Sequence, residues 1–459
     1  MDLDYVSFDR KRMRAAQAAS IEAVGPERLE VRATRIKEDL RVNIKTTVTI
    51  EHEHANGSSV PRRPKRRAIV VADAGWYTTA DLFSAIPAER GSTLLLTCID
   101  YQNAIRRGIS PLRFKRPLES IAPNLWRREL VLPTGWMKSY PKIGMRPIAR
   151  AVRGWREEHA PDLDLTLVIT YPHYIYLYQM LEVDRLIYFN IDDYSLYWKK
   201  HAKIIENLER EAVAKADLTV CVSRLRRDLL RDLIPPSAAR IEHFPHGLPA
   251  SRAGFIASDR PAELPIDLAH IPRPVLGFVG SLADRLDWAL LDRLARELPH
   301  ASIVLIGDRP RTDRNEAAWI EAVRTLEQKP NVWFVGRRAN AQIARYIQAF
   351  DICLIPYRVD HRFNVACCPT KIIDYMGTGR PIVSTALPEC ALYRDYFHVS
   401  DDADAFIDAT RSILESGSDD GRGFARAEHA HANTCDRVVG RLLDRLDAIE
   451  ETSRDDRPR

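Results

Sequence analysis

The 459-residue sequence lacks long uninterrupted apolar runs, paired cysteines and a strong net charge. Its first residues mix charged and apolar side chains without an apolar core segment, so we expect no secretory signal. The 68 Lys and Arg residues against 63 Asp and Glu leave a formal charge of +5, too mild overall to indicate a nucleic-acid-binding protein. The 20 Gly and 28 Pro follow no period, which excludes a collagen-like chain. Any electrostatic function must therefore lie in a local patch.

Cysteine and histidine usage argues against a disulfide-bonded secreted protein and against a metal-binding protein. The seven cysteines are odd in number, form no Cys-x-x-Cys pair, and lie in part within apolar strand-like runs such as 351–356. This usage is typical of reduced thiols in a cytoplasmic protein. We find no His/Cys spacing typical of metal ligands and no convincing Asp-x-Asp, so we expect neither a metal nor a bound cofactor.

Short apolar strands alternate with helix-patterned segments, and the alternation restarts once. The pattern favours an α/β fold with two doubly wound, Rossmann-like domains that face each other across a cleft. The most membrane-like stretch, Leu165–Val183, contains Pro172 and four tyrosines and divides better into a strand and a short helix. The expected organisation is an N-terminal extension at 1–65, a first domain at 66–250, a second at 270–425 and a C-terminal helix at 426–451, within a long helical pattern over 423–451.

Segment 368–385 carries the most chemical information. Pro369 stands at the first turn of an expected helix over 370–378, so the backbone amides of Thr370 and Lys371 are available to an anion. Lys371 adds a positive charge, and Asp374 is placed to accept hydrogen bonds from a diol. An ordinary capped helix with a solvated lysine and aspartate is the alternative, and the spacing alone does not decide between them.

The same segment resembles the signature P-x-K-x-x-E-Y-x-A-x-G-x-P-V-V of GT-B nucleotide-sugar glycosyltransferases, in the family-4-like (group 1), teichuronic-acid-type branch. Further segments follow in the order of that family, and the resemblance extends over about 67–446: they are 188–194, 245–247, 276–281, 302–307, 330–336 and 350–357. The resemblance implies a GT-B fold and transfer of a sugar from a nucleoside-diphosphate sugar, with UDP or GDP, to a hydroxyl of a glycan or lipid-linked acceptor. It suggests a role in cell-surface or exopolysaccharide synthesis.

The resemblance also implies roles for single residues at the donor. It assigns Pro369, Thr370 and Lys371 to the diphosphate and Asp374 to the ribose. The base would lie near Gly336 and Arg337. Arg285, which follows Gly280 and Ser281, is a further diphosphate candidate, although a solvated arginine at a helix start is nearly as good an interpretation. The sequence departs from the family pattern twice. Asp374 replaces a glutamate and is a shorter carboxylate that can still hold a diol. Ala366 stands where relatives have another glutamate, which leaves the donor sugar and the stereochemistry open.

Two residues are candidates for acid–base catalysis. Asp192 follows the strand expected at 185–190 and lies in a segment that resembles the region of the catalytic aspartate in the xanthan glucuronosyltransferase. Its neighbour Asp193 is the better candidate for a helix cap. His173, at the end of another strand, is the second catalytic candidate, and a buried hydrogen-bonding histidine is the alternative. His246, in the turn that leaves the first domain, favours interdomain geometry over chemistry.

Segment Arg106–Arg156 carries 13 basic residues and two acidic ones, interleaved with aromatic and apolar side chains. Such a patch suits anionic lipid head groups, so we expect peripheral contact at the inner face of a membrane. An RNA-binding patch is the rival, which we set aside, and a solvated basic face over buried aromatics is the structural alternative.

Two other functions fit the same fold. A nucleotide-sugar 2-epimerase would consume the sugar nucleotide without an acceptor. A non-catalytic subunit would bind the sugar nucleotide within a polysaccharide-synthesis assembly.

Overall fold

The computed structural model describes residues 64–106, 108–109, 117–137, 141–197, 201–233, 240–253, 264–308 and 318–455. The chain divides into two units, 1–63 and 64–459, and everything below concerns the second. The extension expected at 1–65 therefore lies almost wholly outside the described residues.

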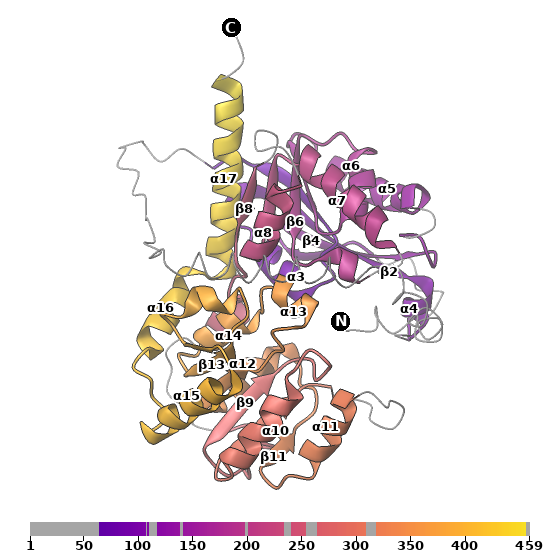
Figure 1. Cartoon of the computed structure of the whole chain (residues 1–459). Coiled ribbons are helices and arrows are strands. Elements are labelled where there is room, and N and C mark those ends of the chain that lie inside the picture. The colour runs from indigo at the N-terminus through magenta and orange to yellow at the C-terminus, as the bar shows by residue number, and fades with distance from the viewer. Residues whose placement is uncertain are drawn as a thin grey trace. The chain divides into compact units, whose positions relative to one another are not determined.

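The first half of this unit is built on an eight-stranded sheet (Figure 1). Every neighbouring pair is parallel except β3 and β4. Parallel strands covered on both faces need apolar side chains throughout, and the burial of all six residues of β1 follows from this. In spatial order the strands are β3 (Glu119–Ala122), β4 (Leu125–Leu132), β2 (Gly91–Asp100), β1 (Arg67–Ala72), β5 (Leu165–Ile169), β6 (Arg185–Asn190), β7 (Leu218–Cys221) and β8 (Ile241–His243).

Helices cover this sheet. One group packs together: α5 (Pro141–His159), α6 (Ile175–Tyr178) and α7 (Ala202–Lys215). Helix α3 (Tyr77–Ser84) packs instead against the C-terminal helix, while α4 (Tyr101–Arg106) follows β2 and α8 (Arg224–Arg231) follows β7. The membrane-like stretch at 165–183 is a strand, a 3-10 turn and the short helix α6, as expected.

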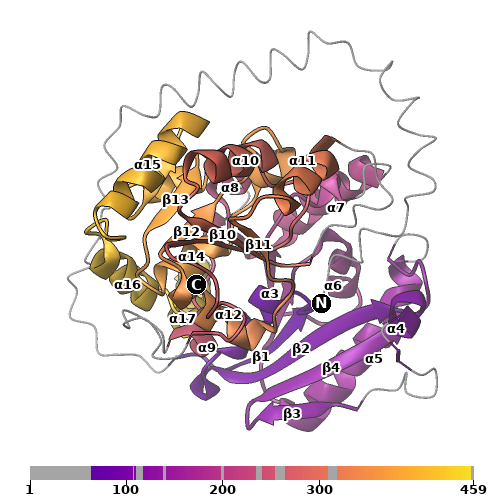
Figure 2. The same ribbon diagram turned by 90° about the horizontal axis from the view of Figure 1, so that it is seen from below.

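The second half is a six-stranded, fully parallel sheet. Its strands, in spatial order, are β11 (Val332–Phe334), β10 (Ser302–Ile306), β9 (Val275–Val279), β12 (Ile352–Ile355), β13 (Ile382–Thr385) and β14 (His398–Ser400). Figure 2 shows helices on both faces of this sheet. One face carries α10 (Trp288–Glu297), α11 (Ala318–Glu327) and α15 (Ala403–Glu415), and the other carries α12 (Ile343–Ala349) and α14 (Lys371–Met376).

The C-terminal segment corrects the expectation of one long helix over 423–451. It forms α16 (Gly423–Ala432) and α17 (Cys435–Asp455), separated by Asn433 and Thr434. The backbone of Leu248 fills the break, because its N–H donates to the Asn433 carbonyl at 2.8 Å and its carbonyl accepts from Cys435 at 2.9 Å. The apolar face of α17 joins the core of the first half, which the chain left 180 residues earlier.

Candidate active site

In both sheets the order in which successive strands are added reverses at a central strand. Strand β1 lies between β2 and β5, and β9 lies between β10 and β12. In open α/β sheets, ligands bind beyond the carboxyl ends of the strands at such a switch point. The loops that follow β1, β6, β9 and β12 are therefore the first place to look for a site.

Side chains from these two sets of strand ends are in contact. The Tyr77 hydroxyl, just after β1, lies 3.3 Å from Oγ1 of Thr370, which immediately precedes α14. The ring of Tyr197, shortly after β6, meets that of Phe363 on α13 (Arg362–Ala366) edge to face, with centroids 5.1 Å apart. Residues far apart in the chain thus form one cluster at the carboxyl edges of both sheets.

Asp192 is the carboxylate that the first half contributes to this cluster. It follows β6, and its Oδ2 accepts a hydrogen bond of 2.7 Å from the Tyr197 hydroxyl. Burial raises the pKa of Asp192 to about 6, and the Tyr197 hydrogen bond and the positive charge of Arg285 oppose the rise. The two charges act on each other across the cluster although Asp192 and Arg285 belong to different halves. A carboxylate with this pKa is ionised at neutral pH and basic enough to take a proton.

The backbone around Asp192 is fixed from below. The side-chain amide of Asn190, the last residue of β6, donates to the Asp192 carbonyl at 3.0 Å. Asp193 caps the following 3-10 turn η6 (Tyr194–Leu196) by accepting from the Ser195 N–H at 3.1 Å and its hydroxyl at 2.6 Å. The expected division of labour is therefore confirmed for Asp193: it is the cap, and Asp192 is left for other work.

His173, the second catalytic candidate, lies in the 3-10 turn η5 (Pro172–Tyr174) after β5. Its side chain belongs to the interior, with the residue only 4% exposed. This burial favours the alternative of a hydrogen-bonding core histidine. Its catalytic role stays a prediction.

Lys371 is the cation that α14 contributes. Its Nζ donates to the Tyr357 hydroxyl at 2.7 Å and lies 5.0 Å from the centre of the Phe278 ring. A side chain at Gly280, where φ is +156°, would be strained and would place its Cβ 2.6 Å from this Nζ, so Lys371 could not keep this position beside a larger residue. Lys371 thus lies against the loop after β9, and both Lys371 and Ser281 in that loop are half-buried. Their role at a donor stays a prediction.

Arg285 follows in the same loop and is not the solvated arginine of the alternative interpretation. Its Nε donates to Oδ1 of Asn364 at 2.7 Å. The guanidinium carbon lies 4.3 Å from the centre of the Phe363 ring, within cation–π distance. Arg285 is therefore held by α13, within range of the Asp192 charge, rather than directed into solvent.

Asp374 departs from the expectation of a carboxylate open to a diol. It is buried on α14, and its Oδ1 accepts from Nη1 of Arg252 on the short helix α9 (Ala250–Ala253), in the segment between the two halves. Burial raises the pKa of Asp374, although the charges of Arg252 and Lys371 counter it. A ribose hydroxyl at Asp374 would have to share the carboxylate with Arg252.

The remaining predicted donor residues are spread around this cluster. Helix α14 begins at Lys371 and has only six residues, against the nine expected over 370–378, and the carbonyl of the buried Pro369 accepts from the Ile372 N–H at 3.1 Å. Gly336, with φ at +82°, follows β11, where Arg337 pairs with Asp308 at 3.7 Å. The two follow the edge strand of the second sheet that lies farthest from β13 and β14.

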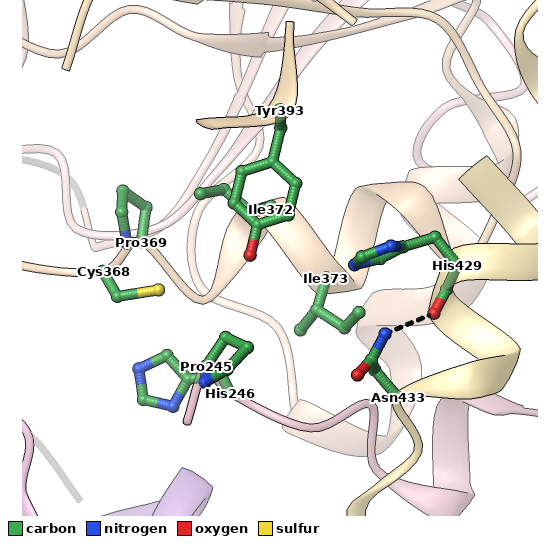
Figure 3. A pocket seen from close by; sticks show the side chains of 9 residues that line it. All are labelled: Pro245, His246, Cys368, Pro369, Ile372, Ile373, Tyr393, His429 and Asn433. Atoms are coloured by element: carbon green, nitrogen blue, oxygen red, sulfur yellow. Dashed lines mark hydrogen bonds between the residues drawn. The ribbon is translucent and has the colours of Figure 1, made fainter. Parts of the chain in front are cut away.

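A small pocket lies behind α14 (Figure 3). Its volume of about 10 Å³ is at the lower limit for one water molecule, so it is no nucleotide site. Burial lowers the pKa of His246 in its wall to about 4, which keeps that imidazole neutral and agrees with a role in packing between the halves. The lining residues are Pro245, His246, Cys368, Pro369, Ile372, Ile373, Tyr393, His429 and Asn433.

The basic segment Arg106–Arg156 folds as β3, β4 and α5 in its described parts. The aromatic side chains expected at a membrane interface are largely core: Trp136 and Trp155 are fully buried, and Trp126 stacks on His159 at 4.6 Å. The solvated basic face over buried aromatics is thus what forms, and the exposed side of α5 carries Lys142, Arg146 and Arg150. Among the described helices, none is long and apolar enough to cross a bilayer.

Several residues of the cluster escaped the sequence analysis. Arg252 and Asn364 belong to no recognised motif, and each acts on a partner about 80 or more residues away in the chain. Tyr197 and Tyr357 could have been found, because both lie shortly after strands that were expected.

Comparisons with known proteins follow the same division of the chain. Residues 273–416 match the family described as "Glycosyl transferases group 1". The chain is 23% identical over 222 residues to the teichuronic acid biosynthesis glycosyltransferase TuaH of Bacillus subtilis. This match covers 48% of the chain and 53% of TuaH, so the chain spans about half the length of this relative.

Solved structures match over most of the chain. The sucrose-phosphate synthase of Thermosynechococcus elongatus superposes with a TM-score of 0.59 at 15% identity, covering 84% of this chain and all of that one. HepE of Anabaena, in complex with UDP and glucose, superposes with a TM-score of 0.58 at 12% identity, covering 83% of this chain and 100% of HepE. An E. coli structure described as "Trehalose-6-phosphate … bound with UDP-2-fluoro glucose" superposes with a TM-score of 0.60 at 13% identity, covering 83% of this chain and 98% of that one. These likenesses confirm the GT-B fold, and the family match agrees with the predicted glycosyltransferase.

Proposed function

We propose that this chain, whose residues 273–416 match the group 1 glycosyltransferases, transfers a sugar from a nucleoside-diphosphate sugar to an acceptor hydroxyl. The observation that carries the proposal is the electrostatic interaction of Asp192, from one half, with Arg285, from the other. Lys371 belongs to the same cluster, since Asp192, Arg285 and Lys371 all act on the Cys367 thiol. A base on one side and fixed positive charge on the other are what such a transfer needs.

The cations would act on the departing nucleotide. As the bond between the anomeric carbon and the diphosphate oxygen breaks, negative charge grows on that oxygen. Lys371 supplies a compact charge, and Arg285 supplies a planar fork suited to phosphate oxygens. Both are held by neighbouring side chains before any ligand arrives, so little reorganisation accompanies the step.

Asp192 would act on the acceptor. The acceptor hydroxyl forms a bond to the anomeric carbon, its proton passes to Asp192, and the nucleoside diphosphate leaves with the electrons of the broken bond. The raised pKa of Asp192 matches this task, since an ordinary aspartate is a weaker base.

The donor is expected to carry UDP or GDP, and UDP is favoured because two matching structures hold UDP or a UDP-sugar. Gly336 and Arg337 are proposed near the base and Asp374 near the ribose, where it shares its carboxylate with Arg252. Gly280, Ser281, Pro369 and Thr370 would line the diphosphate beside Lys371. We propose no metal or resident cofactor for the reaction, and the rate should survive EDTA.

The acceptor is proposed to be a glycan or lipid-linked hydroxyl, supported by the teichuronic acid relative. A lipid-linked acceptor would bring the exposed basic side of α5 to an anionic membrane surface. Replacing Lys142, Arg146 and Arg150 with Gln should abolish co-sedimentation with vesicles containing phosphatidylglycerol. Equal binding by the wild type to vesicles of phosphatidylcholine alone would contradict the electrostatic contact.

The donor assignment is tested by a thermal-shift screen against UDP-, GDP- and ADP-sugars, followed by calorimetry on the best hit. Lys371→Ala should weaken nucleotide binding about tenfold, as expected for a lost hydrogen bond to a charged group. Lys329→Ala is the matched control, because Lys329 pairs with Asp292 at 3.1 Å on the same half, away from the cluster. Unchanged affinity in Lys371→Ala would refute the site, and consumption of the donor without acceptor would indicate an epimerase instead.

A further inference from the structure

Helix α13 carries a buried side-chain amide, that of Asn364, which has no role in the reaction proposed above. We propose that Asn364 is a positioning residue that fixes the Arg285 guanidinium at the diphosphate. This inference rests on the proposed function and adds to it the device that orients one of the two cations. Asn364 itself would touch neither substrate.

Asn364 is completely buried, and its side chain uses its acceptor and both donor hydrogens on two residues. Oδ1 accepts from Nε of Arg285 at 2.7 Å, and Nδ2 donates to the Arg285 carbonyl at 2.9 Å. The same Nδ2 donates to the carbonyl of Arg358 at 2.9 Å. One amide therefore holds both the backbone and the side chain of Arg285.

Two further contacts fix the plane of the guanidinium. The Phe363 ring lies 4.3 Å from the guanidinium carbon, and Nη2 donates to Sγ of Cys367 at 3.4 Å. All three supporting side chains come from α13 or the residue that follows it. Phe363 also contacts Tyr197, which donates to Asp192, so the support of Arg285 is continuous with that of the proposed base.

The same helix is where this chain departs from the family pattern. Ala366, in the last position of α13, stands where the resembling enzymes carry a glutamate. Here the helix acts through a neutral amide on a cation. A long arginine side chain loses considerable rotamer freedom when it binds, and a clamp present beforehand removes that cost from the binding step.

The test is a double-mutant cycle read by calorimetric binding of UDP, or of GDP if the screen selects it. Asn364→Ala should weaken binding about tenfold, on the scale of one hydrogen bond to a charged group. In an Arg285→Ala background the same substitution should change affinity less than twofold, because no guanidinium remains to be held. Equal losses in both backgrounds would overturn the inference.

Asn331→Ala is the matched control. Its amide also donates to backbone carbonyls, those of Ala295, Leu298 and Ala301, but it lies at the opposite end of β11 from Gly336. This variant should lose stability and keep its nucleotide affinity. Loss of affinity in Asn331→Ala equal to that in Asn364→Ala would show a general effect of a disturbed fold and overturn the inference.

The pH profile gives a readout that a merely structural role would not move. If Arg285 is released, its charge no longer favours ionised Asp192, so the acidic limb of kcat/KM should move to higher pH in Asn364→Ala. An unmoved limb would count against the clamp. The charged groups that act on Asp192 are Asp193, Arg226 and Arg285. The titratable groups around it that are neutral near pH 7 are Tyr171, Tyr194, Tyr197 and Cys367.

A further variant keeps the test decisive if Asn364→Ala does not fold. Arg285→Lys leaves Asn364 bonded to the Arg358 carbonyl but removes the fork that it holds, and it should lose affinity to a similar extent. Unchanged affinity there would overturn the inference. A wild type that binds no nucleotide would overturn the proposed function as well, whereas an active wild type with unaffected variants would overturn the clamp alone.

Discussion

Two aspartates, the half-buried Asp192 and the buried Asp374, differ mainly in how a cation acts on each. Arg252 forms a direct ion pair with Asp374, and both members are buried. Asp192 instead accepts a hydrogen bond from the neutral hydroxyl of Tyr197. Arg285 acts on it only through its charge, because the Nε of Arg285 donates to Asn364. Burial raises the pKa of both carboxyl groups, but only Asp192 keeps its carboxylate free of a direct ion pair with an arginine within the described chain.

A carboxylate is the stronger base when no arginine forms a direct ion pair with it. A direct guanidinium partner offsets the charge of Asp374 and occupies its Oδ1, which suits a contact between α14 and the segment joining the halves. A hydroxyl partner orients the carboxylate and leaves it basic. Asp374 is thus equipped to hold the donor half in place, and Asp192 to accept a proton.

The largest effect is expected from Asp192→Asn, which removes the base while keeping its shape. Turnover should fall by roughly 10²–10⁴, the range for loss of general-base catalysis. Nucleotide affinity by calorimetry should stay unchanged, because Asp192 is assigned to the acceptor. Near-normal turnover would move the base elsewhere, to His173 or to the substrate itself.

The next effect concerns stability. Arg252→Ala leaves Asp374 buried without its partner, and unfolding in urea should show a loss of about 3–5 kcal/mol at pH 7. The deficit should shrink as the pH falls, since the raised pKa of Asp374 lets the carboxyl take up a proton in the folded state.

The control for Arg252→Ala is Arg296→Ala, which removes an exposed arginine paired with Asp292 on α10 and should change stability little. Combining Arg252→Ala with Asp374→Asn should recover much of the loss. A double variant no more stable than Arg252→Ala would contradict a direct ion pair.

The smallest effect sharpens the account of Asp192. The acidic limb of kcat/KM should fall near pH 6, because protonated Asp192 accepts no proton. Tyr197→Phe removes a hydrogen bond that favours the ionised form, so the limb should move up by roughly half to one pH unit.

Tyr194→Phe is the matched control for that shift, because its hydroxyl donates to the Thr170 carbonyl and not to Asp192. The limb should stay in place in this variant. Equal shifts in the two variants would indicate a general change of burial around Asp192.

The fold was predictable wherever strands are buried on both faces. The strand expected at 185–190 agrees with β6, because a continuous apolar run between turn residues leaves few alternatives. The half-exposed strand β4 and the helix α5 were not predicted within the basic segment, because their polar faces obscure the spacing of the apolar residues. The break between α16 and α17 depends on Leu248, nearly 190 residues away, and no local pattern reports it.

The site was predictable only in part for the same reason. Gly280 and Lys371 lie in motifs, and their contact follows from strand order in a parallel sheet. The partner of Asp374 and the support of Arg285 are tertiary choices, made by Arg252 and Asn364. Local sequence shows which residues carry charge, and folding decides which of those charges are left available.

The most direct test of the account is a crystal structure with UDP or GDP bound. The account predicts diphosphate oxygens within hydrogen-bond distance of Lys371 Nζ and the Arg285 guanidinium, with the carboxylate of Asp192 on the acceptor side of the β-phosphate. A nucleotide bound away from both cations, or on the far side of α14 from Gly280, would contradict it.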